Sequence, residues 1–186
     1  MLPTNLVSTC IFIVQFAKTL SSQMAGVKPK VLVFDLDYTL WPFWVDTHVT
    51  PPFRKTSQGV IIDSLGYNVN QYPEPSEVLS DLHKQGYILA VASRTGEVQG
   101  AQQLIELLGW KKYFSYQQIY PGGKTKHLTN IKKALGVEFK DMIFFDDEGR
   151  NIRDVSELGV LSILVKNGVT KKVVNDAIQQ FSAQRS

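Results

Sequence analysis

The chain has 186 residues, 44% of them hydrophobic, which suits one domain with a buried core. Its net charge is +3 at pH 7, and no basic block is interleaved with aromatic residues, so we expect no nucleic-acid groove. The single cysteine, Cys10, excludes an internal disulfide framework and a cysteine-rich metal site.

Residues 1–28 are expected to be an extension outside the domain, which we place at residues 29–186. The extension contains no Asp or Glu, as is typical of transit peptides, but it also lacks Arg. Its apolar run, residues 10–14, is too short to span a membrane. A disordered or untranslated leader with Met24 as the natural start and a targeting segment both stay open. We expect a cytoplasmic protein, with organellar targeting as the alternative.

Apolar runs alternate with segments of helical periodicity along the rest of the chain. Strands are predicted at residues 31–34, 87–92, 114–120, 142–145 and 160–165, and helices at 76–83, 98–108, 126–135, 152–158 and 171–181. A short hairpin is predicted around residues 60–62, and Ser76 is the expected N-cap of the first helix. This alternation is typical of an α/β fold with a parallel sheet covered by helices on both faces.

Polar side chains directly follow three of the predicted strands. They are Asp35 and Asp37, Ser93 and Arg94, and Asp146 and Asp147. Because ligands bind outside the carboxyl ends of parallel strands, we expect these side chains to line one site. Asp35 and Asp37 point the same way while the chain is extended. Two carboxylates so close need a cation, and oxygen ligands suit Mg²⁺.

This set of side chains is suited to phosphoryl transfer. One carboxylate of the first pair could attack phosphorus, while the other gives a proton to the leaving oxygen and later takes one from water. Mg²⁺ and Lys124 would offset the repulsion between the nucleophile and the phosphoryl oxygens. Ser93 could hold phosphate oxygens, and Asp147 could complete the metal site.

Each of these residues also has a structural interpretation when taken alone. An Asp-x-Asp pair is common in turns, and Ser93 or the pair at 146–147 could cap the helix that follows. Lys124 follows two glycines but lacks the spacing of a phosphate-binding P-loop. The recurrence of these residues at successive strand ends favours the catalytic interpretation.

An aromatic segment, residues 41–48, follows the first strand and is broken by Pro42. Its rings could cover the core, or they could form a flap that lines a substrate pocket. The sequence leaves both interpretations open.

The order of these motifs resembles the haloacid dehalogenase superfamily of phosphohydrolases. The motifs are Asp35-x-Asp37-x-Thr39, Ser93, Lys124 and Asp146-Asp147, and the longer phrases at 33–44, 92–95 and 144–148 are similar to its magnesium-dependent phosphatases. The similarity covers about residues 29–182. It implies a three-layer, Rossmann-like fold with a central parallel sheet and a minimal cap or none.

The resemblance also implies roles for single residues. Asp35 would be the nucleophile that forms an aspartyl-phosphate, and Asp37 the general acid and base. Mg²⁺ would be bound by the Asp35 carboxylate, the Asp37 backbone carbonyl and an acid of the last motif. We favour Asp147 for that ligand, and the supporting residues would be Thr39 and Asp146.

Substrate contacts are expected as well. They would be made by Leu36, Trp44, Ser93, Arg94 and Lys124. The substrate would be a phosphorylated small molecule, such as a sugar phosphate, or an aryl phosphate such as phosphotyrosine. We expect neither a nucleic-acid partner nor a membrane span.

Two other functions remain open on the same scaffold. A phosphotransferase would share the residues, whereas a dehalogenase needs no metal and does not explain the acidic fourth motif. A non-catalytic phosphate- or protein-binding module would have no need for a nucleophile and an acid two residues apart.

Overall fold

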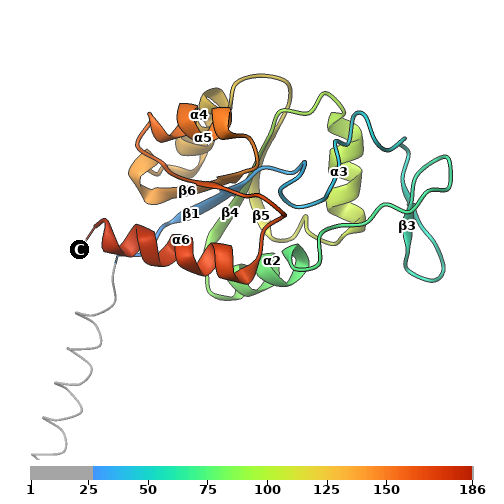
Figure 1. The fold of residues 1–186 in the computed structure, drawn as a ribbon, viewed down its shortest axis with the longest axis horizontal. Coiled ribbons are helices and arrows are strands. Elements are labelled where there is room, and N and C mark those ends of the chain that lie inside the picture. The colour runs from blue at the N-terminus through green and yellow to red at the C-terminus, as the bar shows by residue number, and fades with distance from the viewer. Residues whose placement is uncertain (1–26, 186) are drawn as a thin grey trace, which may run out of the picture.

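The computed structural model describes residues 27–185, so the expectations for residues 1–26 lie outside the described part. A five-stranded parallel sheet forms the centre of the fold, in the order β5-β4-β1-β6-β7 (Figure 1). The strands are β1 (Val31–Phe34), β4 (Ile88–Ser93), β5 (Phe114–Ile119), β6 (Met142–Asp146) and β7 (Leu161–Leu164). All five predicted strands are present.

Helices cover both faces of this sheet, as Figure 1 shows. They are α2 (Pro75–Lys84), α3 (Val98–Leu107), α4 (Lys124–Leu135), α5 (Gly149–Ser156) and α6 (Lys171–Ala183), and a 3-10 helix, η1, covers Phe139–Asp141. One hydrophobic cluster joins the sheet to α2, α3 and α6, and a second joins it to α4 and α5. These three layers confirm the predicted fold class.

Strand β1 is packed from both sides because its four residues are all apolar. Val31 and Val33 belong to the cluster under α4 and α5, while Leu32 and Phe34 belong to the other. All four are fully buried, at 0% exposure. Burying one such side chain contributes about 1.5–3 kcal/mol, so β1 holds the residues that follow it in a fixed position.

Three predicted helix starts differ from the structure. Ser76 is not an N-cap: Glu74 occupies that position, and Pro75 begins α2 because its fixed φ suits the first turn. Helix α4 begins at Lys124 rather than 126, and α5 at Gly149 rather than 152. Both first turns are polar, so apolar periodicity could not reveal them.

A small hairpin lies between β1 and α2. Strands β2 (Arg54–Lys55) and β3 (Ile61–Ile62) pair antiparallel, as predicted, and Figure 1 shows β3 far from the sheet, beyond α3. Between residues 35 and 74 the hairpin is the only sheet, and no helix occurs there. The fold therefore has no separate cap domain between β1 and α2.

Among residues 27–185, no helix has the length and apolar character needed to cross a bilayer.

Candidate active site

The predicted site residues meet at the carboxyl ends of β1, β4 and β6. Phe34 pairs with Val91 on one side and Phe145 on the other, so the strands end side by side. A cavity of about 420 Å³ opens there. Seven predicted residues line it: Asp35, Asp37, Trp44, Ser93, Arg94, Lys124 and Asp147. The other three, Leu36, Thr39 and Asp146, are fully buried, each at 0% exposure.

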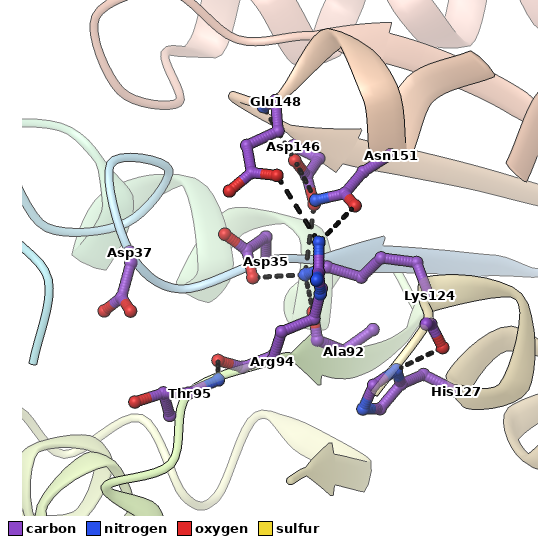
Figure 2. A network of polar contacts seen from close by, with 12 residues as sticks. Asp35, Asp37, Ala92, Arg94, Thr95, Lys124, His127, Asp146, Glu148 and Asn151 are labelled. Carbon is purple, nitrogen blue, oxygen red and sulfur yellow. Dashed lines mark hydrogen bonds and ion pairs between the residues drawn. The ribbon is translucent and has the colours of Figure 1, made fainter. Parts of the chain in front are cut away.

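Lys124 lies at the centre of the polar network in Figure 2. Its ammonium donates to Asp35 Oδ1 and to the backbone oxygen of Ala92, and it lies 3.0 Å from Asp146 Oδ2. These three acceptors match the three N–H groups of an ammonium. Burial alone would lower the pKa of Lys124, but the charges of Asp35 and Asp146 raise it above its usual value.

Three carboxylates face this single ammonium. Oxygens of Asp35, Asp146 and Asp147 all lie within 4.8 Å of one another. Burial raises the pKa of Asp35 well above its usual value, and the charge of Lys124 offsets only part of that shift. Burial and the charge of Asp146 raise the pKa of Asp147 to about 6. An excess of hard oxygen donors over cationic charge fits a divalent cation such as Mg²⁺.

The two acids that follow β6 differ in their surroundings. Asp146 accepts hydrogen bonds from Glu148 N at 2.8 Å and from Asn151 Nδ2 at 3.0 and 3.1 Å, besides its contact with Lys124. Asp147 instead lines the cavity and is partly exposed. Asp147 is therefore the member of the pair that a bound ligand can reach.

Asn151 was not predicted as a site residue. It is 4% exposed, and its side-chain oxygen accepts a hydrogen bond from Arg94 Nη1 at 3.1 Å while its amide nitrogen holds Asp146. The sequence feature that could have indicated this role is an amide side chain five residues after Asp146, within the first turn of α5. Arg94, expected to contact substrate, lines the cavity and also lies 3.5 Å from Glu148 Oε2.

Asp37 lies apart from this cluster, on the other side of Asp35 in Figure 2. Its Oδ1 accepts hydrogen bonds from Trp41 Nε1 at 2.6 Å and from Val45 N at 3.2 Å. Burial raises the pKa of Asp37 to about 6, although both hydrogen bonds lower it. A carboxylic acid with this pKa can exchange a proton near neutral pH, as an acid and base catalyst must.

A tight turn after β1 brings Trp41 back toward Asp37. The backbone N–H groups of Thr39, Leu40 and Trp41 point to the Leu36 oxygen at 3.2, 2.8 and 3.4 Å. Tyr38 adopts a left-handed φ of 53° within this turn. Leu36 itself is fully buried and does not line the cavity, so the structure does not bring it to the cavity wall as expected of a substrate contact.

Thr39 was predicted to support the metal ligands, but its side chain makes no hydrogen bond to them. Within residues 27–185, the buried Oγ1 of this threonine has no hydrogen-bond partner.

The aromatic segment at 41–48 serves both purposes considered above. Trp41 is fully buried and stacks between Phe43 and Trp110, at centroid distances of 5.7 and 6.2 Å. Trp44 is 48% exposed, lines the cavity and stacks on His48 at 5.1 Å. The first ring therefore belongs to the core and the second to the cavity wall.

Ser93 ends β4 and does not cap α3. The N-cap of that helix is Glu97, whose side chain accepts a hydrogen bond from Gly100 N. Ser93 is 1% exposed, and its Oγ accepts a hydrogen bond from Thr95 N at 3.4 Å. Likewise the N-cap of α5 is Glu148, not a residue of the pair at 146–147. The capping interpretations of these motif residues are therefore wrong.

Comparison with known proteins gives consistent matches. Residues 27–184 match the acid phosphatase family. Magnesium-dependent phosphatase 1 of Homo sapiens is 51% identical over 154 residues, which cover 83% of this chain and 88% of that protein. A HAD-like hydrolase superfamily protein of Schizosaccharomyces pombe is 43% identical over 143 residues, covering 71% and 83%.

A solved structure supports the same fold. It is a haloacid dehalogenase-like family protein from Streptococcus pneumoniae, 13% identical, with a TM-score of 0.57 over 79% of this chain and 90% of that one. The matches confirm the predicted resemblance and that the chain is a phosphatase. The chain belongs to the acid phosphatase family and, within the haloacid dehalogenase superfamily, to the magnesium-dependent phosphatases.

Proposed function

We propose that this phosphatase hydrolyses phosphomonoesters through an aspartyl-phosphate formed on Asp35. The observation that carries the proposal is the placement of Asp35 between the Lys124 ammonium and the separately held acid Asp37. A binding module would gain nothing from burying a nucleophile beside a cation and a proton donor.

In the first step, an oxygen of Asp35 forms a bond to phosphorus while the bond from phosphorus to the leaving oxygen breaks. Asp37 gives its proton to that oxygen. In the second step, Asp37 takes a proton from a water molecule, the water oxygen bonds to phosphorus, and the bond to Asp35 breaks. Inorganic phosphate leaves, and both side chains return to their starting state.

Mg²⁺ would be held by the Asp35 carboxylate, the Asp37 backbone carbonyl and the Asp147 carboxylate, with Asp146 behind them. The cluster of carboxylate oxygens from Asp35, Asp146 and Asp147 supports this set, while the Asp37 carbonyl is proposed from the resemblance to the magnesium-dependent phosphatases. When bound, the ion supplies positive charge that offsets the repulsion between an anionic nucleophile and a phosphoryl group.

The substrate would be an aryl phosphate, phosphotyrosine included, or a sugar phosphate. Ser93 and Lys124 would hold the phosphoryl oxygens, and Arg94 would contact the substrate near them. The half-exposed ring of Trp44 on the cavity wall favours a flat aryl leaving group. The absence of a cap domain between β1 and α2 leaves the cavity open to water, which favours hydrolysis over transfer to another acceptor.

The test is to trap the phosphorylated enzyme. Wild-type protein mixed with radiolabelled phenyl phosphate and Mg²⁺, then quenched in acid, should carry label that hydroxylamine removes, as expected of an acyl phosphate. Asp35→Asn should carry none and should lose turnover, while its circular dichroism stays unchanged. Label on the Asp35→Asn protein, or normal turnover by it, would rule out the mechanism.

A further inference from the structure

The two carboxylate oxygens of Asp37 are not equivalent. Oδ1 accepts both hydrogen bonds that this side chain makes, from Trp41 Nε1 at 2.6 Å and from Val45 N at 3.2 Å. Within residues 27–185, Oδ2 accepts none. An oxygen that already receives two N–H donors has no favourable direction left for a proton of its own.

The donor at 2.6 Å is held rigidly. The indole of Trp41 is fully buried between the rings of Phe43 and Trp110, with interplanar angles of 9° and 6°. Closely packed rings in a core cannot turn without displacing their neighbours. The turn at residues 36–41 fixes the backbone of Trp41. The position of Nε1 is therefore set both by this turn and by the packing of the ring.

We propose that Trp41 is a positioning residue, which holds Oδ1 of Asp37 as an acceptor and so keeps the acidic proton on Oδ2, facing the leaving oxygen. The inference rests on the proposed function of Asp37 as the general acid. It adds a division of labour between the two oxygens: one is fixed to the protein, and the other exchanges the proton.

Without the indole N–H, Val45 N alone would hold the carboxyl group, and the group could rotate about its Cβ–Cγ bond. Protons would then be presented in more than one direction, and proton transfer would lose its fixed geometry. The cost falls on substrates whose leaving oxygen needs the proton. Good leaving groups depart without one, so they should be little affected.

The chain offers a matched control for this test. Trp110 belongs to the same stack, is also fully buried, and donates its Nε1 to Ser76 Oγ at 2.9 Å instead of to Asp37. Trp41→Phe and Trp110→Phe therefore each remove one buried indole N–H and leave a six-membered ring in place. Only the first change touches the acid.

The experiment measures kcat/KM for phenyl phosphate, a poor leaving group, and for 2,4-dinitrophenyl phosphate, a good one. Trp41→Phe should lower the value for phenyl phosphate about tenfold and for the activated ester less than about twofold, because one hydrogen bond to the acid is lost. Trp110→Phe should change both substrates by the same factor. Benzothienylalanine in place of Trp41, which keeps the ring shape without the N–H, should repeat the result even if the phenylalanine variant fails to fold.

Equal losses on both substrates in the Trp41 variants would overturn the inference and assign Trp41 a structural role alone. Asp37→Asn, measured beside them, separates a failure of the role of Trp41 from a failure of the role of Asp37. If the loss of kcat/KM in Asp37→Asn depends on the leaving group and the loss in the Trp41 variants does not, only the role of Trp41 is ruled out. If Asp37→Asn shows no such dependence, the proposed function of Asp37 fails first.

Discussion

The ammonium of Lys124 joins the carboxylate of Asp35, which directly follows β1, to that of Asp146, which ends the neighbouring strand β6. Its side chain is 1% exposed, so this charge is almost fully removed from water. Losing one partner of such a buried cluster leaves charges without compensation, which costs far more than losing a surface ion pair. The same residue therefore supports the fold and, in the proposed mechanism, the chemistry.

Lys124→Met should lower the free energy of unfolding by about 3–5 kcal/mol, because it leaves two buried carboxylates without a cation. Urea denaturation measured by circular dichroism at pH 7 checks this. Lys133→Met, at an exposed position on the same helix, is the control and should change stability by less than about 0.5 kcal/mol. A loss at Lys124 as small as the control's would contradict the role assigned to the buried ammonium.

The sequence allowed the sheet and the strand-end residues to be predicted for one reason. Runs such as residues 31–34 and 142–145 are apolar without interruption, and the carboxyl ends of parallel strands always share an edge. Those two facts place Asp35 and Asp146 at the same edge, and the order of the strands, with β1 beside β6, makes them neighbours. No information about side-chain packing was needed.

Other parts of the site depend on packing that the sequence does not display. Trp41 and Trp44 are three residues apart and chemically identical, yet one is buried and the other is 48% exposed. The tight turn and the left-handed conformation of Tyr38 decide between them. Asn151 was missed because its amide reaches Asp146 only once the polar first turn of α5 has formed.

Trp44→Ala should weaken the binding of aryl substrates without unfolding the protein. Loss of one aromatic contact corresponds to about 0.5–1.5 kcal/mol, so we expect KM for phenyl phosphate to rise about two- to tenfold with kcat nearly constant. Glucose 6-phosphate, which has no aromatic ring, should show a smaller change. Tyr67→Ala, at a 69% exposed aromatic on the loop after β3, serves as the control. Equal effects of the two variants would mean that Trp44 does not contact the substrate.

His127 should make the stability of the protein depend on pH. Its ring nitrogens lie 2.9 Å from the Gly123 oxygen and 3.0 Å from the Tyr120 oxygen, and its side chain is fully buried. Burial lowers the pKa of His127 below its usual value of 6.5 by more than the hydrogen bonds to the two backbone oxygens raise it, and the charges of Lys124 and Arg94 lower it further. The unfolded chain therefore binds the proton more readily than the folded protein does.

The resulting contribution to stability is fully present above about pH 6.5 and is lost as the pH falls through the lower pKa of the folded state. Urea denaturation of the wild type and of His127→Gln between pH 5 and pH 7.5 tests this. The wild type should lose more stability than the variant on acidification. Parallel curves for the two proteins would contradict a lowered pKa.

Asn151→Ala should impair the metal site without removing a metal ligand. The amide donates to both oxygens of Asp146, and a buried acceptor that loses its donor costs about 1–3 kcal/mol. We expect a higher Mg²⁺ concentration to be needed for half-maximal activity, because Asp146 would no longer be held in place. Asn175→Ala, at an exposed asparagine on α6, should leave that concentration unchanged. An unchanged Mg²⁺ requirement in Asn151→Ala would show that Asp146 is oriented by Lys124 and the backbone alone.

Mg²⁺ should stabilise the folded protein as well as support its activity. Asp35, Asp146 and Asp147 bring mutually repelling oxygens within 4.8 Å of one another, and a divalent cation relieves that repulsion only in the folded state. A ligand at 100 times its dissociation constant adds about 2.7 kcal/mol, so Mg²⁺ should raise Tm by several degrees and EDTA should reverse the rise and abolish turnover. Asp147→Asn should lose most of this shift, whereas Asp46→Asn, a change at another carboxylate that lines the cavity, should keep it. If Mg²⁺ raised the Tm of Asp147→Asn as much as that of the wild type, Asp146 rather than Asp147 would be the direct ligand.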